Sequence, residues 1–210
     1  MNEPLERRRA LTKGERTRER LLRAAIDRFG ADGFRATSVS QLSRDAGLTP
    51  AAAYAYFDDK DALWRSAIAA DLDALRTEIA GAALRDERPI LALMLGVISG
   101  MQRHALARRV LVEGSLADLQ FVLTHPIFAD LTTLLAAGLT ARQERGVLPA
   151  EANPAQLALG MESVIFSLVL ASVRAGMESE PDRVEAVVAL LYAAAGGPPT
   201  PQERVNTPMR

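Results

Sequence analysis

The sequence predicts an all-helical protein of about nine helices. Hydrophobic residues make up 49% of its 210 residues and aromatic residues only 5%, while alanine is plentiful. A composition rich in alanine and poor in aromatic residues favours helices over sheets. Apolar residues also recur at helical spacing along most of the chain, and Gly- and Pro-containing turns separate these periodic stretches.

The chain is long enough for two helical domains that share one connecting helix. From the apolar periodicity we expect a flexible basic arm over 1–14, a first domain over 15–62, a second over 63–196 and a disordered, proline-rich tail over 197–210. The chain contains no cysteine, which excludes disulfides and thiol chemistry. Because its first residues are charged rather than apolar, we expect a cytoplasmic protein.

Charge is distributed unevenly along the chain. The net charge is −1, but residues 1–50 hold eleven Lys or Arg against seven Asp or Glu, which leaves the remaining 160 residues with fourteen against nineteen. Basic side chains attract nucleic acid because they displace counterions from its phosphates. A solvated charged surface is the alternative explanation for such a bias.

Residues 38–60 have the pattern of two short helices joined at a corner. Ser38 stands three residues before a glutamine, which is the spacing of a capping box, and apolar residues then predict a helix over 39–46. Gly47 can adopt the left-handed backbone that ends this helix, and Thr49 can cap a second helix that begins at Pro50. Such a corner either packs two helices together or, in a helix-turn-helix, places the second helix in the major groove of DNA.

The residues around this corner distinguish the two interpretations. Between Thr17 and Trp64 the chain carries, in order and without a gap, Thr-Arg-Glu-Arg-Leu-Leu, Ala24-Ala25, Phe29, Asp32-Gly33-Phe34, Thr37-Ser38-Val39, Ala46-Gly47-Leu48, Tyr54-x-Tyr56-Phe57 and Lys60-x-x-Leu63. This segment resembles the DNA-binding domain of the tetracycline-repressor (TetR) family of transcriptional regulators. The resemblance implies an all-helical homodimeric repressor whose C-terminal domain binds a small molecule.

The expected second helix carries few hydrogen-bond donors for bases. Alanine can contact thymine methyl groups but cannot make the bidentate contacts that Arg, Asn or Gln make. The resemblance implies that a tyrosine hydroxyl of the Tyr54-x-Tyr56 motif contacts a phosphate of the DNA backbone. It also implies that the ammonium group of Lys60 binds a phosphate as a point charge. The residues that we expect to contact DNA are Arg35, Thr37, Ser38, Arg44, Thr49, Pro50, Ala51, Ala52, Tyr54, Tyr56 and Lys60.

The second domain is expected to begin with a long helix over 59–85, which in the TetR family transmits ligand binding to the DNA-binding domain. Helices over 90–104 and 107–124 and a third that opens at Pro126 and stops at Gly146 follow. Their Met, Leu and Phe stripes indicate either a solid core or, as the resemblance implies, an apolar ligand pocket. Candidate lining residues are Met94, Ile98, Met101, Gln102, Leu116, Gln120, Phe121, Phe128, Leu131 and Glu162.

Two further helices, capped at Asn153 and opened at Pro181, are expected to end the second domain. The first is apolar on almost every side, but Gln156, Glu162 and several serines interrupt it, so we interpret it as buried rather than membrane-spanning. In the TetR family this helix pair forms a four-helix interface with its symmetry mate. The expected interface residues are Phe166, Leu170, Val173, Val184, Val188 and Leu191.

The sequence lacks a nucleotide-binding glycine loop, a metal-binding cluster and a nucleophile elbow. We therefore expect no cofactor and no enzymatic activity. His104 and His125 are expected to be surface or capping residues rather than metal ligands. Glu162, in an apolar helix, is expected to be a ligand anchor, an interface residue or an acid with a raised pKa.

Our leading hypothesis is a dimeric repressor that a small, largely apolar effector releases from a double-stranded DNA operator. The alternative, suggested by the alanine-rich second helix, is a helical ligand-binding or scaffold protein whose DNA specificity is degraded.

Overall fold

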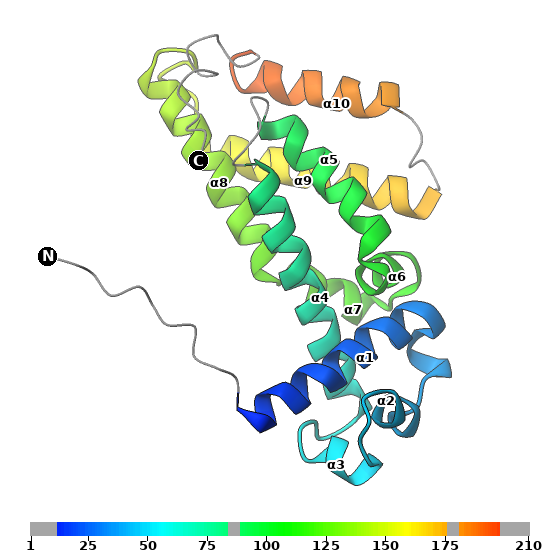
Figure 1. Ribbon diagram of the computed structural model, residues 1–210. Coiled ribbons are helices and arrows are strands. Elements are labelled where there is room, and N and C mark those ends of the chain that lie inside the picture. Colours follow the sequence, from blue (N-terminus) through cyan, green and yellow to red (C-terminus); the bar gives the residue numbers. More distant parts are fainter. Residues whose placement is uncertain (1–11, 84–88, 176–180, 198–210) are drawn as a thin grey trace, which may run out of the picture. The chain divides into compact units, whose positions relative to one another are not determined.

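The computed structural model describes residues 12–83, 89–175 and 181–197. These residues form ten α-helices and no strand, which confirms the all-helical class (Figure 1). The chain divides into two compact units, Met1–Ala67 and Ile68–Arg210. We call their described parts the head and the body. The boundary between them falls inside a helix, five residues after the position expected from the sequence.

The head contains α1 (Lys13–Ala36), α2 (Val39–Asp45), α3 (Pro50–Tyr54) and the first turns of α4 (Lys60–Ala83). α1 begins two residues before the expected start of the first domain, because Thr12 and Glu15 form a capping box there. Residues 1–11 of the expected arm lie outside the described residues. Gly33 interrupts α1 with φ 81°, a backbone conformation that glycine adopts readily, so the main helix ends there as expected.

The core of the head is built around an aromatic cluster. The ring of Phe29 meets the ring of Trp64 edge-on at a centroid distance of 5.1 Å, and Phe34 lies 5.4 Å from the same indole. Edge-to-face contacts of this kind stabilise a core beyond the apolar area that they bury. Trp64 belongs to α4, so this cluster fixes the start of α4 against α1.

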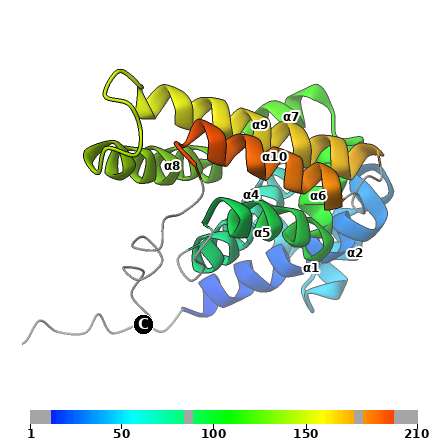
Figure 2. The ribbon, with the colours of Figure 1, turned by 90° about the horizontal axis from the view of Figure 1, so that it is seen from above.

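The body contains the rest of α4 together with six helices: α5 (Pro89–Arg103), α6 (Ala105–Glu113), α7 (Leu116–Leu123), α8 (Pro126–Glu144), α9 (Pro154–Ala175) and α10 (Pro181–Ala194). α8 packs along α9, α9 also contacts α5 and α6, and α10 contacts α5 (Figure 2). The single helix expected over 107–124 is wrong. Gly114 takes an extended backbone, and Ser115 opens α7 through a capping box with Asp118.

Both histidines stand at helix starts. His104 occupies the N-cap position of α6 and His125 that of α8, where its Nδ1 accepts a hydrogen bond from the amide of Ile127. Of the two expected roles, surface or capping, the structure therefore favours the helix start, and both side chains are buried.

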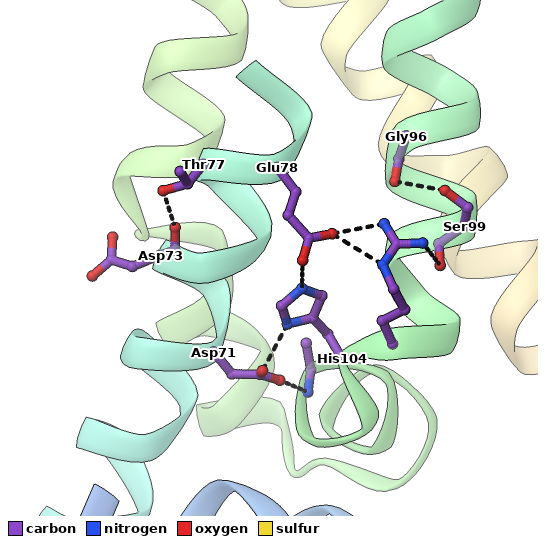
Figure 3. Close-up of polar contacts among 9 residues, drawn as sticks. Asp71, Asp73, Thr77, Glu78, Gly96, Ser99 and His104 are labelled. Carbon is purple, nitrogen blue, oxygen red and sulfur yellow. Dashed lines mark hydrogen bonds and ion pairs between the residues drawn. The ribbon is translucent and has the colours of Figure 1, made fainter. Parts of the chain in front are cut away.

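The side chain of His104 joins α4 to the corner between α5 and α6 (Figure 3). Its Nδ1 lies 2.7 Å from Oδ1 of Asp71 and its Nε2 lies 3.3 Å from Oε1 of Glu78. The other oxygen of Asp71 accepts a hydrogen bond of 2.9 Å from the amide of Ala107 in the first turn of α6. The guanidinium of Arg103 donates to Glu78 and holds the pKa of that carboxyl below its usual range.

α9 is, among the described helices, the one that is long and apolar enough by itself to cross a membrane. Helices in the core of a globular protein have the same composition, and α9 packs against α5, α6 and α8. Asn153 caps it as expected, because its side chain accepts hydrogen bonds from Ala155 and Gln156. Burial raises the pKa of Glu162, in the middle of this helix.

A buried arginine at the end of α8 fixes the end of α10. The Nε of Arg142 donates 2.7 Å to the carbonyl of Ala195, and its Nη2 donates 2.7 Å to the carbonyl of Gly197. These carbonyls follow the last turn of α10, where backbone acceptors lack helical partners and a cation is favoured. Arg142 therefore caps a helix end that lies more than fifty residues further along the chain.

Replacing Arg142 by Met is expected to lower the free energy of unfolding by about 2 to 4 kcal/mol, because buried carbonyls would lose a charged donor. Urea denaturation followed by circular dichroism measures this change. Arg65, an exposed residue of α4, provides the control, and Arg65→Met is expected to stay within about 0.5 kcal/mol of the wild type. Equal stabilities of the two variants would contradict the capping role.

Replacing Glu162 by Gln is expected to stabilise the protein at pH 7. A raised pKa means that the folded state holds its proton more tightly than the unfolded state, so stability falls as pH rises from the ordinary carboxyl pKa to the raised value. The glutamine side chain does not titrate, so the variant does not lose stability over this pH range. The gain, measured by urea denaturation, should disappear below about pH 4, where both states are protonated. Exposed Glu144, changed to Gln, is the control. A stability difference that does not depend on pH would contradict the assignment.

Candidate nucleic-acid interface and apolar cavity

The corner between α2 and α3 has the geometry that its sequence predicts. The hydroxyl of Ser38 accepts from the amide of Gln41 at 3.3 Å, and that of Thr49 accepts from Ala52 at 3.2 Å. Gly47 has φ 67°, and the amide of the following residue turns back to the carbonyl of Ser43 at 2.7 Å. These local interactions end α2 and start α3 within five residues.

α3 presents one face to solvent and buries the other. Ala53 is buried in the head, whereas Pro50 and Ala51 are exposed and Tyr54 is 53% exposed. The exposed face therefore consists of small side chains with one phenol at its end. Most of the predicted contact residues share this exposure, namely Arg35, Ser38, Arg44, Thr49, Pro50, Ala51 and Tyr54, while Ala52, Tyr56 and Lys60 are half-buried.

Thr37 is the exception among the predicted contact residues. It is only 2% exposed, and its hydroxyl donates 2.8 Å to the carbonyl of Gly33. The side chain satisfies the carbonyl that the kink in α1 leaves without a helical partner. Thr37 is thus a structural residue, and the expectation that it faces a phosphate is corrected.

Two half-buried residues of the head, Lys60 and Tyr56, place polar groups near helix starts. The ammonium of Lys60 lies 4.2 Å from the centre of the Phe34 ring, a cation–π contact that positions it at the start of α4. The hydroxyl of Tyr56 lies near Gly14, at the N-terminal end of α1. Lys60 and Tyr56 therefore place a cation and a hydroxyl at helix starts of the head.

An ion pair that the sequence did not reveal fixes α2 against α1. Nε of Arg28 lies 2.5 Å from Oδ2 of Asp45, and its Nη1 lies 3.1 Å from Asp32. This hydrogen bond between Arg28 and Asp45 lowers the pKa of the Asp45 carboxyl and raises the pKa of the Arg28 guanidinium. Arg28 is thereby engaged inside the head, so the charge for an external partner has to come from other arginines.

The body encloses a cavity of about 660 Å³ between α4, α5, α6, α7, α8 and α9. Its deep end is lined by buried apolar side chains, namely Leu72, Leu75, Ile79, Met101, Ala107, Leu111, Val122, Ile165 and Val169. Its outer end lies between α4 and α8, where the lining residues Thr77, Ala80, Asp130, Thr133, Leu134 and Ala137 are exposed and Arg76 is half-buried. Cavities of this size and lining suit small, largely apolar molecules.

Three of the predicted ligand residues line this cavity: Met101, Phe128 and Leu131. Leu116 is 73% exposed instead, because the break before Ser115 gives α7 a direction that the single expected helix would not have had. The remaining predicted residues with described side chains also lie outside the lining: Ile98, Gln102, Gln120, Phe121 and Glu162. The side chain of Met94 lies outside the described part of the structure.

The predicted dimer residues mostly face the interior of their own chain. Phe166 lines the cavity, with its ring 5.4 Å from that of Phe128. Three others are buried in the body, namely Val173, Val188 and Leu191, while Leu170 and Val184 are half-buried. The exposed apolar residues of these two helices are instead Leu159, Val164 and Leu190. A helix that is apolar all round does not reveal which side its own domain covers.

Residues 21–67, which comprise most of the head, match the profile of a family described as bacterial regulatory proteins, tetR family. An uncharacterized HTH-type transcriptional regulator, YdgC, from Bacillus subtilis (strain 168) is 39% identical over 57 residues. The match covers 27% of this chain and 29% of that protein, so it spans less than a third of the relative's length.

Solved structures extend the similarity to the whole fold. The fatty acid degradation regulator FadR from Bacillus halodurans superposes with a TM-score of 0.65 at 16% identity, over 83% of this chain and 94% of that one. NalD, the secondary repressor of the MexAB-OprM multidrug efflux pump in Pseudomonas aeruginosa, gives 0.60 at 22% identity, over 87% and 97%. The profile match thus assigns residues 21–67 to the tetR family of bacterial regulatory proteins, and the solved structures show that the chain as a whole shares the fold of these two proteins.

Proposed function

We propose that this chain is a DNA-binding transcriptional repressor that acts as a homodimer and releases its operator when a small, largely apolar molecule binds in the body. The observation that carries the proposal is the α2–α3 corner, which exposes one face of α3 on a head that matches a family of regulatory proteins. On this proposal the protein works in the cytoplasm and has no catalytic role.

Binding to DNA is supported by the charge and exposure of the head. The exposed Arg35 and Arg44 are cations close to the corner, and Ser38 and Thr49 place hydroxyls at the starts of α2 and α3. Cations and helix starts bind phosphate oxygens and set the register of a protein on the duplex. Because the exposed face of α3 is mostly alanine, we expect contacts to thymine methyl groups and groove shape to provide much of the sequence preference.

Binding of an effector is supported by the cavity in the body. Leu72, Leu75 and Ile79 of α4 form part of its wall, and the same helix carries Leu63 and Trp64 in the core of the head. A molecule that fills the cavity would contact the helix on which the head depends. NalD, whose fold is similar, is a repressor of a multidrug efflux pump. A regulatory role for the present chain, with a small molecule as its effector, agrees with this similarity.

Dimerisation is supported by the exposed apolar residues of α9 and α10. Leu159 is 57% exposed and Leu190 is 60% exposed in the single chain, although other apolar side chains of both helices are buried. Large exposed apolar side chains on two successive helices are typical of a surface that a second copy covers. We therefore assign the dimer contact to this face rather than to the buried residues expected from the sequence.

The proposal is tested by selecting duplexes from a random DNA library with the purified protein. A repressor should enrich one sequence and bind it at least about 1,000-fold more tightly than random DNA at physiological salt. Enrichment of no sequence would contradict the proposal and favour the alternative of a ligand-binding or scaffold protein, which the three alanines of α3 suggest.

Replacing Lys60 by Ala is expected to weaken binding to selected and random duplexes alike, by about three- to tenfold, because a phosphate contact carries no sequence information. Fluorescence anisotropy over a salt series should also give a slope smaller by about one per protomer. Arg145→Ala at the end of α8, outside the proposed dimer contact, removes the same charge from the body and should leave both values unchanged. An unaltered salt slope for Lys60→Ala would remove Lys60 from the interface.

Replacing Leu190 by Glu is expected to convert the dimer to a monomer, because it would bury a charge in the proposed contact. Sedimentation velocity gives the oligomeric state directly. Leu116 of α7 is at least as exposed, so Leu116→Glu is the matched control and should stay dimeric. If both variants sediment as dimers, the contact lies elsewhere on the chain.

A further inference from the structure

The cavity in the body has charged groups at one end only. Its deep end is apolar, and Arg76 and Asp130 are the charged residues among its described lining side chains. Both lie at the outer end, Arg76 on α4 and Asp130 on α8, where they form an ion pair with Nε of Arg76 2.6 Å from Oδ2 of Asp130. A ligand with an apolar body in the deep end would thus bring any polar group to this pair.

A second carboxylate shares the same arginine. Nη1 of Arg76 lies 3.7 Å from Oδ1 of Asp73, one turn earlier on α4. His125 also approaches Asp73, with its Nε2 3.6 Å from the same oxygen, but burial lowers the pKa of that histidine and so favours its neutral form at pH 7. One guanidinium therefore faces two carboxylates, Asp130 in the lining of the cavity and Asp73 beside it, and these three groups together carry a formal charge of about −1.

The arrangement leaves acceptor capacity on Asp130. The described contacts with Arg76 use Oδ2, and no described residue donates a hydrogen bond to Oδ1. An anionic ligand would have to displace Asp130 from Arg76, and Asp73 would still lie close to the same guanidinium. A cationic group, in contrast, would meet a surplus carboxylate oxygen without breaking the existing pair.

The aromatic lining favours the same charge. Phe128 and Phe166 both line the cavity, with ring centroids 5.4 Å apart in an edge-to-face arrangement. The faces of aromatic rings attract cations, and quaternary ammonium groups in particular are bound in this way. Phe128 stands two residues before Asp130 on α8, so the two side chains leave different sides of the helix, and ring and carboxylate line different parts of the same cavity.

We infer that the cavity selects apolar molecules that carry one positive charge, with the apolar part in the deep end and the cation at the outer end, beside Asp130. The inference rests on the proposed function, since it specifies the chemical class of the effector that the body would bind. Neutral apolar molecules would occupy the same space more weakly, and apolar carboxylates would be the least favoured.

Three probes with the same alkyl chain test the inference: octyltrimethylammonium, 1-octanol and octanoate, titrated into the full-length protein at pH 7 by isothermal calorimetry. We expect octyltrimethylammonium to bind about three- to tenfold more tightly than octanol, and octanoate to bind most weakly, as for charges at a half-exposed site. Because exposed charges are screened, the preference for the cation should shrink between 50 and 500 mM salt. A preference that came only from the larger size of the trimethylammonium group would not change with salt concentration.

Asp130→Asn should bring the affinity for octyltrimethylammonium down to about that for octanol and leave octanol binding within about twofold. Glu144→Gln, an equal charge change at the far end of α8, should alter none of the three affinities. Tighter or equal binding of octanoate, or an undiminished preference in Asp130→Asn, would overturn the charge selection while leaving the apolar pocket in place. Absence of binding by all three probes would overturn the pocket itself, and with it the effector part of the proposed function.

Discussion

One buried carboxylate, that of Asp71, holds the body together around α4. Its two oxygens accept from the ring of His104 and from the amide of Ala107, so it links α4 to the end of α5 and to the start of α6. A buried carboxylate without partners would be costly, whereas one with both oxygens engaged specifies a single arrangement of its helices. The cavity depends on this arrangement, because α4, α5 and α6 all contribute to its wall.

α4 is the element that both activities of the proposed function share. Its first turns contribute Leu63 and Trp64 to the core of the head, and its later turns contribute Leu72, Leu75 and Ile79 to the cavity. A ligand changes an equilibrium only as far as it binds two conformations with different affinity. A helix whose two ends belong to two packed cores is a suitable place for such a difference to arise.

The sequence predicted best what local chemistry decides. Ser38, Thr49 and Asn153 were recognisable caps because a helix start needs a nearby acceptor, and Gly47 was recognisable because few other residues adopt its backbone conformation. The break at Gly114 and Ser115 was missed, because the apolar residues on either side continue at helical spacing. Hydrophobic periodicity indicates that one face of a helix is buried, but it does not indicate which neighbouring element covers that face.

The candidate sites depend on contacts distant in sequence, and those were predicted only in part. Asp71 and His104 are thirty-three residues apart, and Arg142 caps a helix end fifty-three residues away, which no local pattern indicates. The exposed face of α3 followed from the resemblance to the TetR family. Thr37 was wrongly expected to contact a phosphate, because the sequence does not reveal the kink at Gly33 whose carbonyl its hydroxyl binds.

The central claim, that the cavity and the α2–α3 corner are coupled, is tested most directly by one affinity measured twice. The dissociation constant of octyltrimethylammonium is determined for the free protein and for its complex with a duplex that the protein has selected. Linkage requires that a ligand which weakens DNA binding is itself bound more weakly by the DNA complex, by about fivefold or more for a typical coupling. Equal dissociation constants in the two states would contradict the account.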